Sequence, residues 1–273
     1  MFESLISSLQ QLVQQFSQQF SQPLSLSMVV LLLIVGVLFG LINTIAGGGS
    51  VLTLPALMLI GLEPHAANAT NRVGGAIQTL SAAFGFWKRG AFKGQSLGFL
   101  IFYALLGGIL GPWLSLQLSQ KSMGWVIQGC LILIALFTLF APKSLFEDPP
   151  PPKRSLFAQH LGAFLVSLYG GFLQAGIGLV SLYYLRFVCG YDLVKGTAVK
   201  AVYLCALTLP TLIVFMWYGQ VRWGAGILLA IGGLLGAAIG VRLSLSSSGQ
   251  QVIRKALPIT AIMMIIGLIL RSV

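Results

Sequence analysis

The chain has 273 residues, of which 57% are apolar and 8% are charged. A soluble domain carries about 25% charged residues, so this composition excludes a soluble globular protein and indicates an integral membrane protein. The net charge of +11 comes from basic residues that stand singly at the ends of apolar runs. Because they are not clustered on one face, they exclude a nucleic-acid surface as a partner and serve as signals of membrane topology.

The first segment, residues 1–23, predicts an amphipathic helix. Leu5, Leu9, Leu12 and Phe16 recur at helical spacing, with Ser and Gln between them. The segment lacks the positive start and the apolar core of a signal peptide. Two interpretations stay open: a helix that lies in the membrane interface, and a contact in a homo-oligomer.

A series of apolar segments follows, each close to the roughly 20 residues that a helix needs to cross a bilayer. They lie near Met28–Ile45, Leu97–Leu118, Trp125–Ala141, Phe157–Leu173, Val199–Trp217, Gly224–Val241 and Ala256–Leu270, with Val73–Trp87 as a weaker eighth. Val51–Leu62 and Leu179–Val188 are shorter, and about twelve residues rise only about 18 Å against a core of roughly 30 Å. We therefore expect an all-α polytopic membrane protein in which these two segments are half-helices buried in protein.

A glycine break precedes each short segment, and the break is repeated along the chain. Adding 129 to the residue number carries Ala46-Gly47-x-Gly49 onto Ala175-Gly176-x-Gly178. At an offset of 125, Gly107-Gly108-x-x-Gly111 lands on Gly232-Gly233-x-x-Gly236, and these glycines predict close helix packing. A duplicated unit with a glycine break between apolar segments is typical of secondary transporters.

The basic residues predict how the two halves are oriented. If each short segment carries the chain onward, one face holds Lys88, Arg89, Lys93, Lys143, Lys153, Arg154, Lys195, Lys200, Arg242, Arg254 and Lys255. The other face holds Arg72, Lys121, Arg222 and Arg271, while Arg186 falls inside a short segment and stays unassigned. The positive-inside rule then places the larger group in the cytoplasm and both termini outside.

Five crossings per half is an odd number, so the sequence predicts two inverted repeats. Each repeat would hold four long transmembrane helices and one short half-helix after a glycine break. The expected domains are the amphipathic helix 1–23, a first repeat 24–141, a proline-rich cytoplasmic linker 142–156 and a second repeat 157–273.

Residues around the first glycine break carry a family resemblance. Ala46-Gly47-Gly48-Gly49-Ser50, then Leu54-Pro55-Ala56-Leu57 with Gly61, then Ala67-Asn68-Ala69-Thr70-Asn71 resemble the TauE/SafE sulfite exporter family, also called the toluene sulfonate uptake permease family. The resemblance runs from about Met28 to Leu270, with a weaker echo from Gly170 to Lys200. It implies a carrier, expected here to be an exporter, of sulfite or small organosulfonate anions in the bacterial inner membrane. Members of the family differ in substrate and direction, so the resemblance fixes neither.

The chemistry of the two breaks predicts an anion site without the family. The N-terminus of a helix offers unpaired N–H groups and about half a positive charge, worth up to about 2 kcal/mol when buried. Desolvating an anion costs several kcal/mol, so further donors are needed. The predicted substrate-binding residues are Asn43, Gly47, Gly48, Gly49, Ser50, Asn68, Thr70, Asn71, Arg72, Gln174, Gly176, Gly178, Ser181, Thr197 and Lys200, with Thr44 and Thr53 as additional donors near the first break.

Some of these residues also have a purely structural interpretation. Gly47 to Gly49 fit a tight turn between packed helices. Arg72 and Lys200 each stand at the start of an apolar span, where a long cationic side chain can extend to the membrane interface and anchor the helix. His65 fits a surface histidine better than a proton relay.

The acidic residues narrow the function. Only Glu3, Glu63, Glu147, Asp148 and Asp192 are acidic, and none lies within a long span, which favours anions over cations as the cargo. The spans also lack the nucleophile, acid–base pair or metal cluster of an enzyme, and no cofactor is expected. The prediction is therefore a secondary transporter that works by alternating access, with a passive anion channel as the alternative. A coupled proton and a homo-oligomer are left open.

Overall fold

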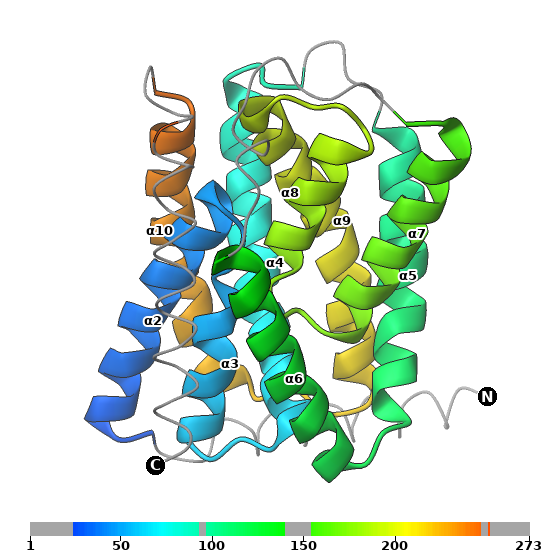
Figure 1. The fold of residues 1–273 in the computed structure, drawn as a ribbon. Helices are drawn as coiled ribbons and strands as arrows, with labels where there is room; N and C mark the ends of the chain where they lie inside the picture. The colour runs from blue at the N-terminus through cyan, green and yellow to red at the C-terminus, as the bar shows by residue number, and fades with distance from the viewer. Residues whose placement is uncertain (1–23, 93–96, 140–153, 247–250, 252–273) are drawn as a thin grey trace, which may run out of the picture.

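The computed structural model describes residues 24–92, 97–139, 154–246 and 251, and within these ranges the chain is all helical (Figure 1). The helices are α2 (Leu26–Ile45), α3 (Ser50–Leu59), α4 (Pro64–Lys88), α5 (Gly98–Leu116), α6 (Gln120–Leu139), α7 (Leu156–Phe172), α8 (Ile177–Phe187), α9 (Leu193–Trp217) and α10 (Trp223–Ser244). The all-α prediction is confirmed. The predicted N-terminal helix, residues 142–153 of the linker and the last predicted span lie outside the described residues.

Four of the described helices, α2, α5, α9 and α10, are long and apolar enough to cross a membrane. The two segments predicted to be short are short, with 10 residues in α3 and 11 in α8. The predicted start of the weaker span at Val73 is wrong, because α4 begins at Pro64. Its first turns are polar, but they are buried inside the protein, so hydropathy did not mark them as part of a span.

Contacts between helices fix their directions. Gly36 of α2 lies against Gly232 of α10, and Thr44 lies against Gly240 farther along both helices, so α2 and α10 run parallel. On the other side of α10, Gly85 of α4 lies against Val241, and α4 runs parallel to α10 as well. Since α2 and α4 run the same way, α3 between them reverses the chain and returns it to the face where α2 begins.

A second group of helices runs in the opposite direction. Gly107 and Gly111 of α5 lie against Ser167 and Gly171 of α7, so these two helices are parallel. Helix α9 packs beside α5 and runs antiparallel to α4, since Phe215 near its end packs with Ala69 near the start of α4. The predicted close packing at the repeated glycines is thereby confirmed: a Cβ atom added at Gly111 would lie 2.3 Å from the backbone nitrogen of Phe172.

The helices therefore form two groups that do not coincide with the two halves of the sequence. We call α2, α3, α4 and α10 the first bundle and α5, α7, α8 and α9 the second bundle, because each helix makes most of its contacts with the members of its own group taken together. In Figure 1, α2 and α10 lie on the left and α5 and α7 on the right, with α6 crossing the front. The main contact between the bundles is made by α4 and α9.

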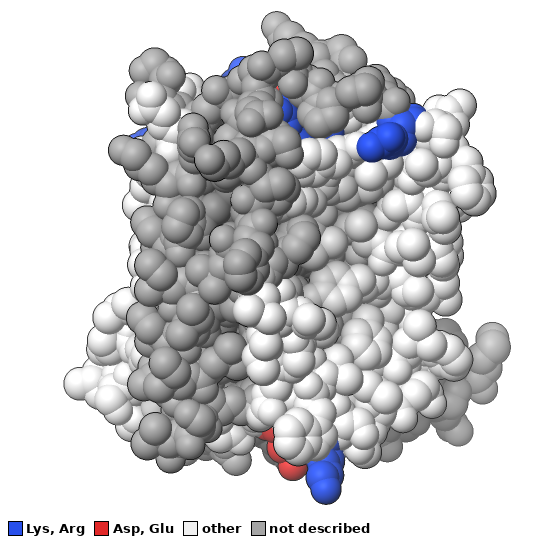
Figure 2. All heavy atoms as spheres, viewed as in Figure 1, with Lys and Arg blue, Asp and Glu red and all other residues white. Residues whose placement is uncertain are grey.

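The outer surface fits a lipid environment. Large apolar side chains such as Trp125, Trp217 and Phe102 are exposed. In Figure 2, the basic side chains lie near the top and bottom edges of the face shown, and the described atoms between these edges are uncharged. The helix directions place exposed basic residues on one face at Lys88, Arg89, Arg154, Lys195 and Arg242, and on the other at Lys121 and Arg222.

Candidate functional site

The two short helices meet, N-terminal end to N-terminal end, inside the protein. A Cβ atom added to Gly47 would lie 2.2 Å from the carbonyl carbon of Gly178, so the two breaks touch through their backbones. Gly47 has φ of +86° and Gly176 has φ of +60°, a region that glycine adopts without strain. The glycines thus do form tight turns, and these turns bring the two breaks together.

Ser50 joins the two breaks by hydrogen bonds. It is the first residue of α3, and its Oγ donates to the carbonyl oxygen of Gln174 at 2.7 Å. The same Oγ accepts from the backbone N–H of Gly176, the N-cap of α8, at 3.1 Å. One hydroxyl therefore connects the start of α3 with the start of α8.

A row of buried polar side chains continues from this contact into α4. Thr53 Oγ1 donates to Asn71 Oδ1 at 2.6 Å, and Asn71 Nδ2 donates to Gln174 Oε1 at 3.1 Å. All three side chains are buried. Since Gln174 belongs to the second break, this row links α3 and α4 of the first bundle to the second bundle.

A second polar group lies at the end of α2. Asn43 Nδ2 donates to Gln78 Oε1 at 2.6 Å, and Gln78 Nε2 donates to Thr44 Oγ1 at 2.8 Å. Sequence reasoning did not select Gln78. The available signal was a single amide within the apolar segment Val73–Trp87, where a polar side chain needs a partner.

Lys200 of α9 is buried and contacts the C-terminal end of α2. Its Nζ donates to the carbonyl oxygens of Asn43 at 3.1 Å and Thr44 at 3.4 Å. These carbonyls belong to the last turn of α2, where the helix supplies no partner of its own. The cation also stabilises the negative end of the helix dipole.

Arg72 of α4 makes the corresponding contact with the C-terminal end of α7. It donates to the carbonyl oxygens of Gly170 at 2.6 Å and Gly171 at 3.1 Å, while Asn68 Nδ2 donates to that of Phe172 at 3.0 Å. Arg72 and Lys200 are 0% and 1% exposed, so the alternative interpretation of them as anchors that snorkel to the interface is wrong. Each lies about two turns inside its helix, where carbonyls of a broken helix solvate it in place of water.

The helix ends at the breaks differ in how their charge is balanced. The negative C-terminal ends of α2 and α7 each contact a cation, whereas the positive N-terminal ends of α3 and α8 face each other. Lys200 and Arg72 occupy the C-terminal ends of α2 and α7, whereas α3 and α8 direct their N-terminal ends toward the same point. Of the acidic residues that the structure describes, Glu63 is exposed at the start of α4 and Asp192 caps the start of α9. Both lie at helix ends on the surface, so the region between α3 and α8 favours an anion.

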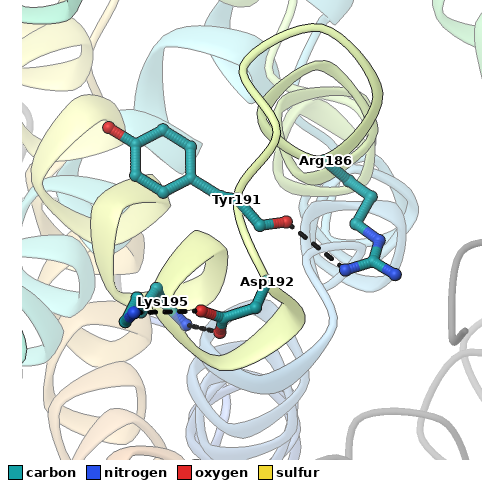
Figure 3. A network of polar contacts seen from close by, with 4 residues as sticks. All are labelled: Arg186, Tyr191, Asp192 and Lys195. Atoms are coloured by element: carbon teal, nitrogen blue, oxygen red, sulfur yellow. Dashed lines mark hydrogen bonds and ion pairs between the residues drawn. The ribbon is translucent and has the colours of Figure 1, made fainter. Parts of the chain in front are cut away.

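The outer end of α8 is held by the turn that leads into α9 (Figure 3). Arg186 donates from NH1 to the carbonyl oxygen of Tyr191 at 3.5 Å. Asp192 accepts from the backbone N–H of Lys195 at 2.8 Å and forms an ion pair with its Nζ at 3.5 Å. Arg186, which the charge pattern left unassigned, thus lies near the face that carries most of the exposed basic residues.

The remaining predicted site residues divide into three groups. Gly48 and Gly49 are buried in the first break, where a Cβ atom on Gly49 would lie 2.4 Å from the carbonyl oxygen of Phe39. Ser181, one turn into α8, is buried and its Oγ has no hydrogen-bond partner among the described residues. Thr70 and Thr197 bond elsewhere, Thr70 as acceptor from the backbone N–H of Arg222 and Thr197 as donor to the carbonyl of Leu193.

Two further side chains, Ile134 and His65, are buried as well. Ile134 of α6 packs against the second break, since a Cβ atom on Gly176 would lie 2.5 Å from its Cδ1. His65 is 5% exposed, and its Nε2 lies 3.0 Å from the carbonyl oxygen of Leu118. The prediction of a surface histidine is therefore wrong, because the start of α4 is covered by the turn between α5 and α6.

Known proteins resemble this chain over most of its length. The family model described as Sulfite exporter TauE/SafE matches residues 32–268. A protein of Escherichia coli K12 named "Probable membrane transporter protein YfcA" is 32% identical over 232 residues, which cover 84% of this chain and 85% of that protein. A Haemophilus influenzae protein named "Probable membrane transporter protein" is 28% identical over 230 residues, covering 84% of this chain and 90% of its own length.

Proposed function

Because the chain belongs to the sulfite exporter TauE/SafE family of membrane transporters, we propose that it exports sulfite or a small organosulfonate anion across the cytoplasmic membrane. The protein is a multi-pass membrane protein. The proposed mechanism is alternating access by a secondary transporter, with the anion held between the N-terminal ends of α3 and α8. The family supports the proposed substrate class. The contact between the starts of α3 and α8 supports the proposed site.

The observation that carries the proposal is the meeting of two helix N-termini at the contact between Gly47 and Gly178. Each end contributes about half a positive charge, so together they balance about one negative charge. Ser50, Asn71 and Gln174 supply polar groups beside this point. A sulfite or sulfonate group has several acceptor oxygens on one sulfur atom, which suits donors that converge from two directions.

The packing supports inverted repeats. Helix α2 packs against α10, and in the same way α7, the first helix of the second half, packs against α5. Helices α4 and α9 are the corresponding members of the two halves, and they run antiparallel in contact with each other. Since α2 runs parallel to α4 and α7 parallel to α9, the proposed second half is inverted relative to the first.

The proposed moving bodies are the two bundles rather than the two sequence halves. Within each bundle, helices pack backbone to backbone through glycines, an arrangement that leaves little freedom to slide. Between the bundles, the backbones of Gly47 and Gly178 touch at the breaks, and the hydrogen bonds there come from Ser50, Asn71, Arg72 and Lys200. Water or an anion can replace such bonds, so this interface is the one at which alternating access would occur.

The exposed basic residues support the proposed orientation. Among the described residues, the exposed basic side chains on one face are Lys88, Arg89, Arg154, Lys195 and Arg242, and those on the other are Lys121 and Arg222. The positive-inside rule therefore assigns the first face to the cytoplasm. In this orientation α2 enters from the outside. The proposed membrane is the bacterial inner membrane.

The test is counterflow in proteoliposomes that contain the purified full chain. Uptake of ³⁵S-sulfite that saturates and is accelerated by unlabelled sulfite or sulfoacetate inside would support a carrier. Uptake that neither saturates nor shows counterflow would favour a passive anion channel. No flux for any sulfur anion would overturn the proposed function, and a dependence on the pH gradient would reveal a coupled proton.

A further inference from the structure

Asn43 presents an acceptor, not a donor, to the start of α8. Its Nδ2 is engaged by Gln78 Oε1 at 2.6 Å. Its Oδ1 points the other way and lies 2.9 Å from the position that a Cβ atom on Gly178 would occupy. Gly178 belongs to the first turn of α8, at the positive end of the helix dipole. The backbone N–H groups on either side of it, those of Ile177 and Leu179, donate to the carbonyl oxygens of Gln174 and Gly176. In this arrangement an oxygen, which can only accept a hydrogen bond, lies beside the positive end of α8.

The hydrogen bonds that hold Asn43 can be formed in a second way without loss. Gln78 Nε2 donates to Thr44 Oγ1 at 2.8 Å, and a threonine hydroxyl both donates and accepts. If the side-chain amides of Asn43 and Gln78 both turn over, Gln78 Nε2 donates to Asn43 Oδ1 and Thr44 Oγ1 donates to Gln78 Oε1. The number of hydrogen bonds is unchanged, and Asn43 Nδ2 then faces Gly178.

We infer that Asn43 and Gln78 form a paired amide switch that selects an acceptor-only anion at the start of α8. The oxygens of sulfite and sulfonates accept hydrogen bonds and do not donate, so they require the arrangement in which Asn43 presents Nδ2. Gln78 does not touch the anion, and its role is to position Asn43. This inference rests on the proposed function, because it assigns a role within the same site.

A second observation on the same side of α8 points to a ligand. Ser181 lies three residues after Gly178, which places both on one side of the helix. Its Oγ is fully buried and has no hydrogen-bond partner among the described residues. A buried hydroxyl without a partner is costly, and an anion oxygen beside Gly178 would satisfy it. The ligand would then receive donors from Asn43, Ser181 and the backbone of α8.

The first test exchanges the two amides. Asn43→Gln and Gln78→Asn each change the length of one side chain and break the pair, whereas the double variant keeps the total length. Each single variant is expected to raise the half-saturating sulfite concentration by about tenfold or more, the cost of losing one hydrogen bond to a charged group. The double variant is expected to return within about threefold of the unmodified chain, with the maximal rate little changed. Gln159→Asn, at the start of α7 outside the site, is the matched control.

The second test is a structure of the full chain with sulfite bound. The expected result is a sulfite oxygen within about 3.2 Å of the Asn43 amide on the side of Gly178, where only a nitrogen can donate. Unchanged half-saturation in the single variants, or a double variant worse than both, would overturn the switch while transport by the unmodified chain upholds the proposed function. An unmodified chain without any sulfur-anion flux overturns both.

Discussion

At the scale of single residues, the buried cations act on helix ends. Lys200 and Arg72 each donate hydrogen bonds to backbone carbonyl oxygens at the C-terminal end of a broken helix of the other bundle. This contact explains how a charge is tolerated in the membrane without a carboxylate partner in the described part of the chain. The two cations also hold the bundles together, through hydrogen bonds to carbonyl oxygens that water can replace.

Replacing Lys200 by Met should abolish counterflow and lower stability. The change leaves the carbonyls of Asn43 and Thr44 unpaired, and each such group costs about 1–3 kcal/mol. Lys121→Met is the control, because Lys121 is exposed on the opposite face. Thermal unfolding and ³⁵S-sulfite counterflow measure the two effects, and equal behaviour of the two variants would remove Lys200 from the site.

Ser50→Ala should weaken the contact between the two breaks. The hydroxyl both donates to Gln174 and accepts from Gly176, so its loss leaves two buried backbone groups without this partner. We expect the free energy of unfolding to fall by about 1–3 kcal/mol, together with slower counterflow. Ser27→Ala, at an exposed position of α2, should change neither quantity. An undiminished rate in Ser50→Ala would show that the hydroxyl is dispensable for transport.

At the scale of elements, glycine decides which helices pair. Helices α2 and α10 approach so closely that a Cβ atom on Gly40 would lie 2.2 Å from the carbonyl oxygen of Gly233. Backbone atoms cannot move aside as a flexible side chain does. The close contact excludes lipid and fixes α2 to a helix from the other half of the chain.

Gly40→Ala should therefore separate α2 from α10 and reduce the yield of monodisperse protein. The matched control is Gly224→Ala in the first turn of α10, where an added Cβ atom meets nothing within 4 Å. Size-exclusion chromatography and thermal unfolding in detergent compare the two variants. If Gly40→Ala is as stable as Gly224→Ala, the two helices are not held by backbone contact.

At the scale of the whole molecule, function depends on whether the two bundles move against each other. The contact between α4 and α9 lies across this interface, and the thiol of Cys205 lies beside the side chain of Thr79. The contact between α4 and α10 lies inside the first bundle. Helix α4 can therefore be joined by a disulfide either to α9, across the interface between the bundles, or to α10, within the first bundle.

A disulfide between Thr79→Cys and the native Cys205 should stop counterflow, and reduction should restore it. A disulfide between Gly85→Cys and Val241→Cys should leave counterflow intact, because both helices belong to the first bundle. A Cβ atom added at Gly85 would lie 3.5 Å from the Cβ atom of Val241, within the usual range for a disulfide. In this second variant Cys205→Ala removes the thiol that could form other disulfides. Inhibition by the second link alone would show that α4 and α10 move relative to each other.

Much of the fold followed from local sequence. Apolar runs predicted the described helices, and the lengths of Val51–Leu62 and Leu179–Val188 predicted two short ones, because hydropathy is a property of consecutive residues. The glycine breaks were visible because tight turns need residues such as Gly47 and Gly176. The sequence also predicted that polar residues would gather around these breaks.

Only the tertiary structure decided which groups meet. Lys200 and Asn43 are 157 residues apart, and no local pattern pairs the charge of one with the carbonyl of the other. Gln78 lies in an apolar span, and its partners Asn43 and Thr44 belong to another helix, so no pattern of neighbouring residues points to these contacts. The division into two interleaved bundles is likewise absent from the linear repeat. Hydropathy and glycine spacing predict where helices lie and break, except at the buried polar start of α4, whereas the choice of partner depends on contacts between segments far apart in the chain.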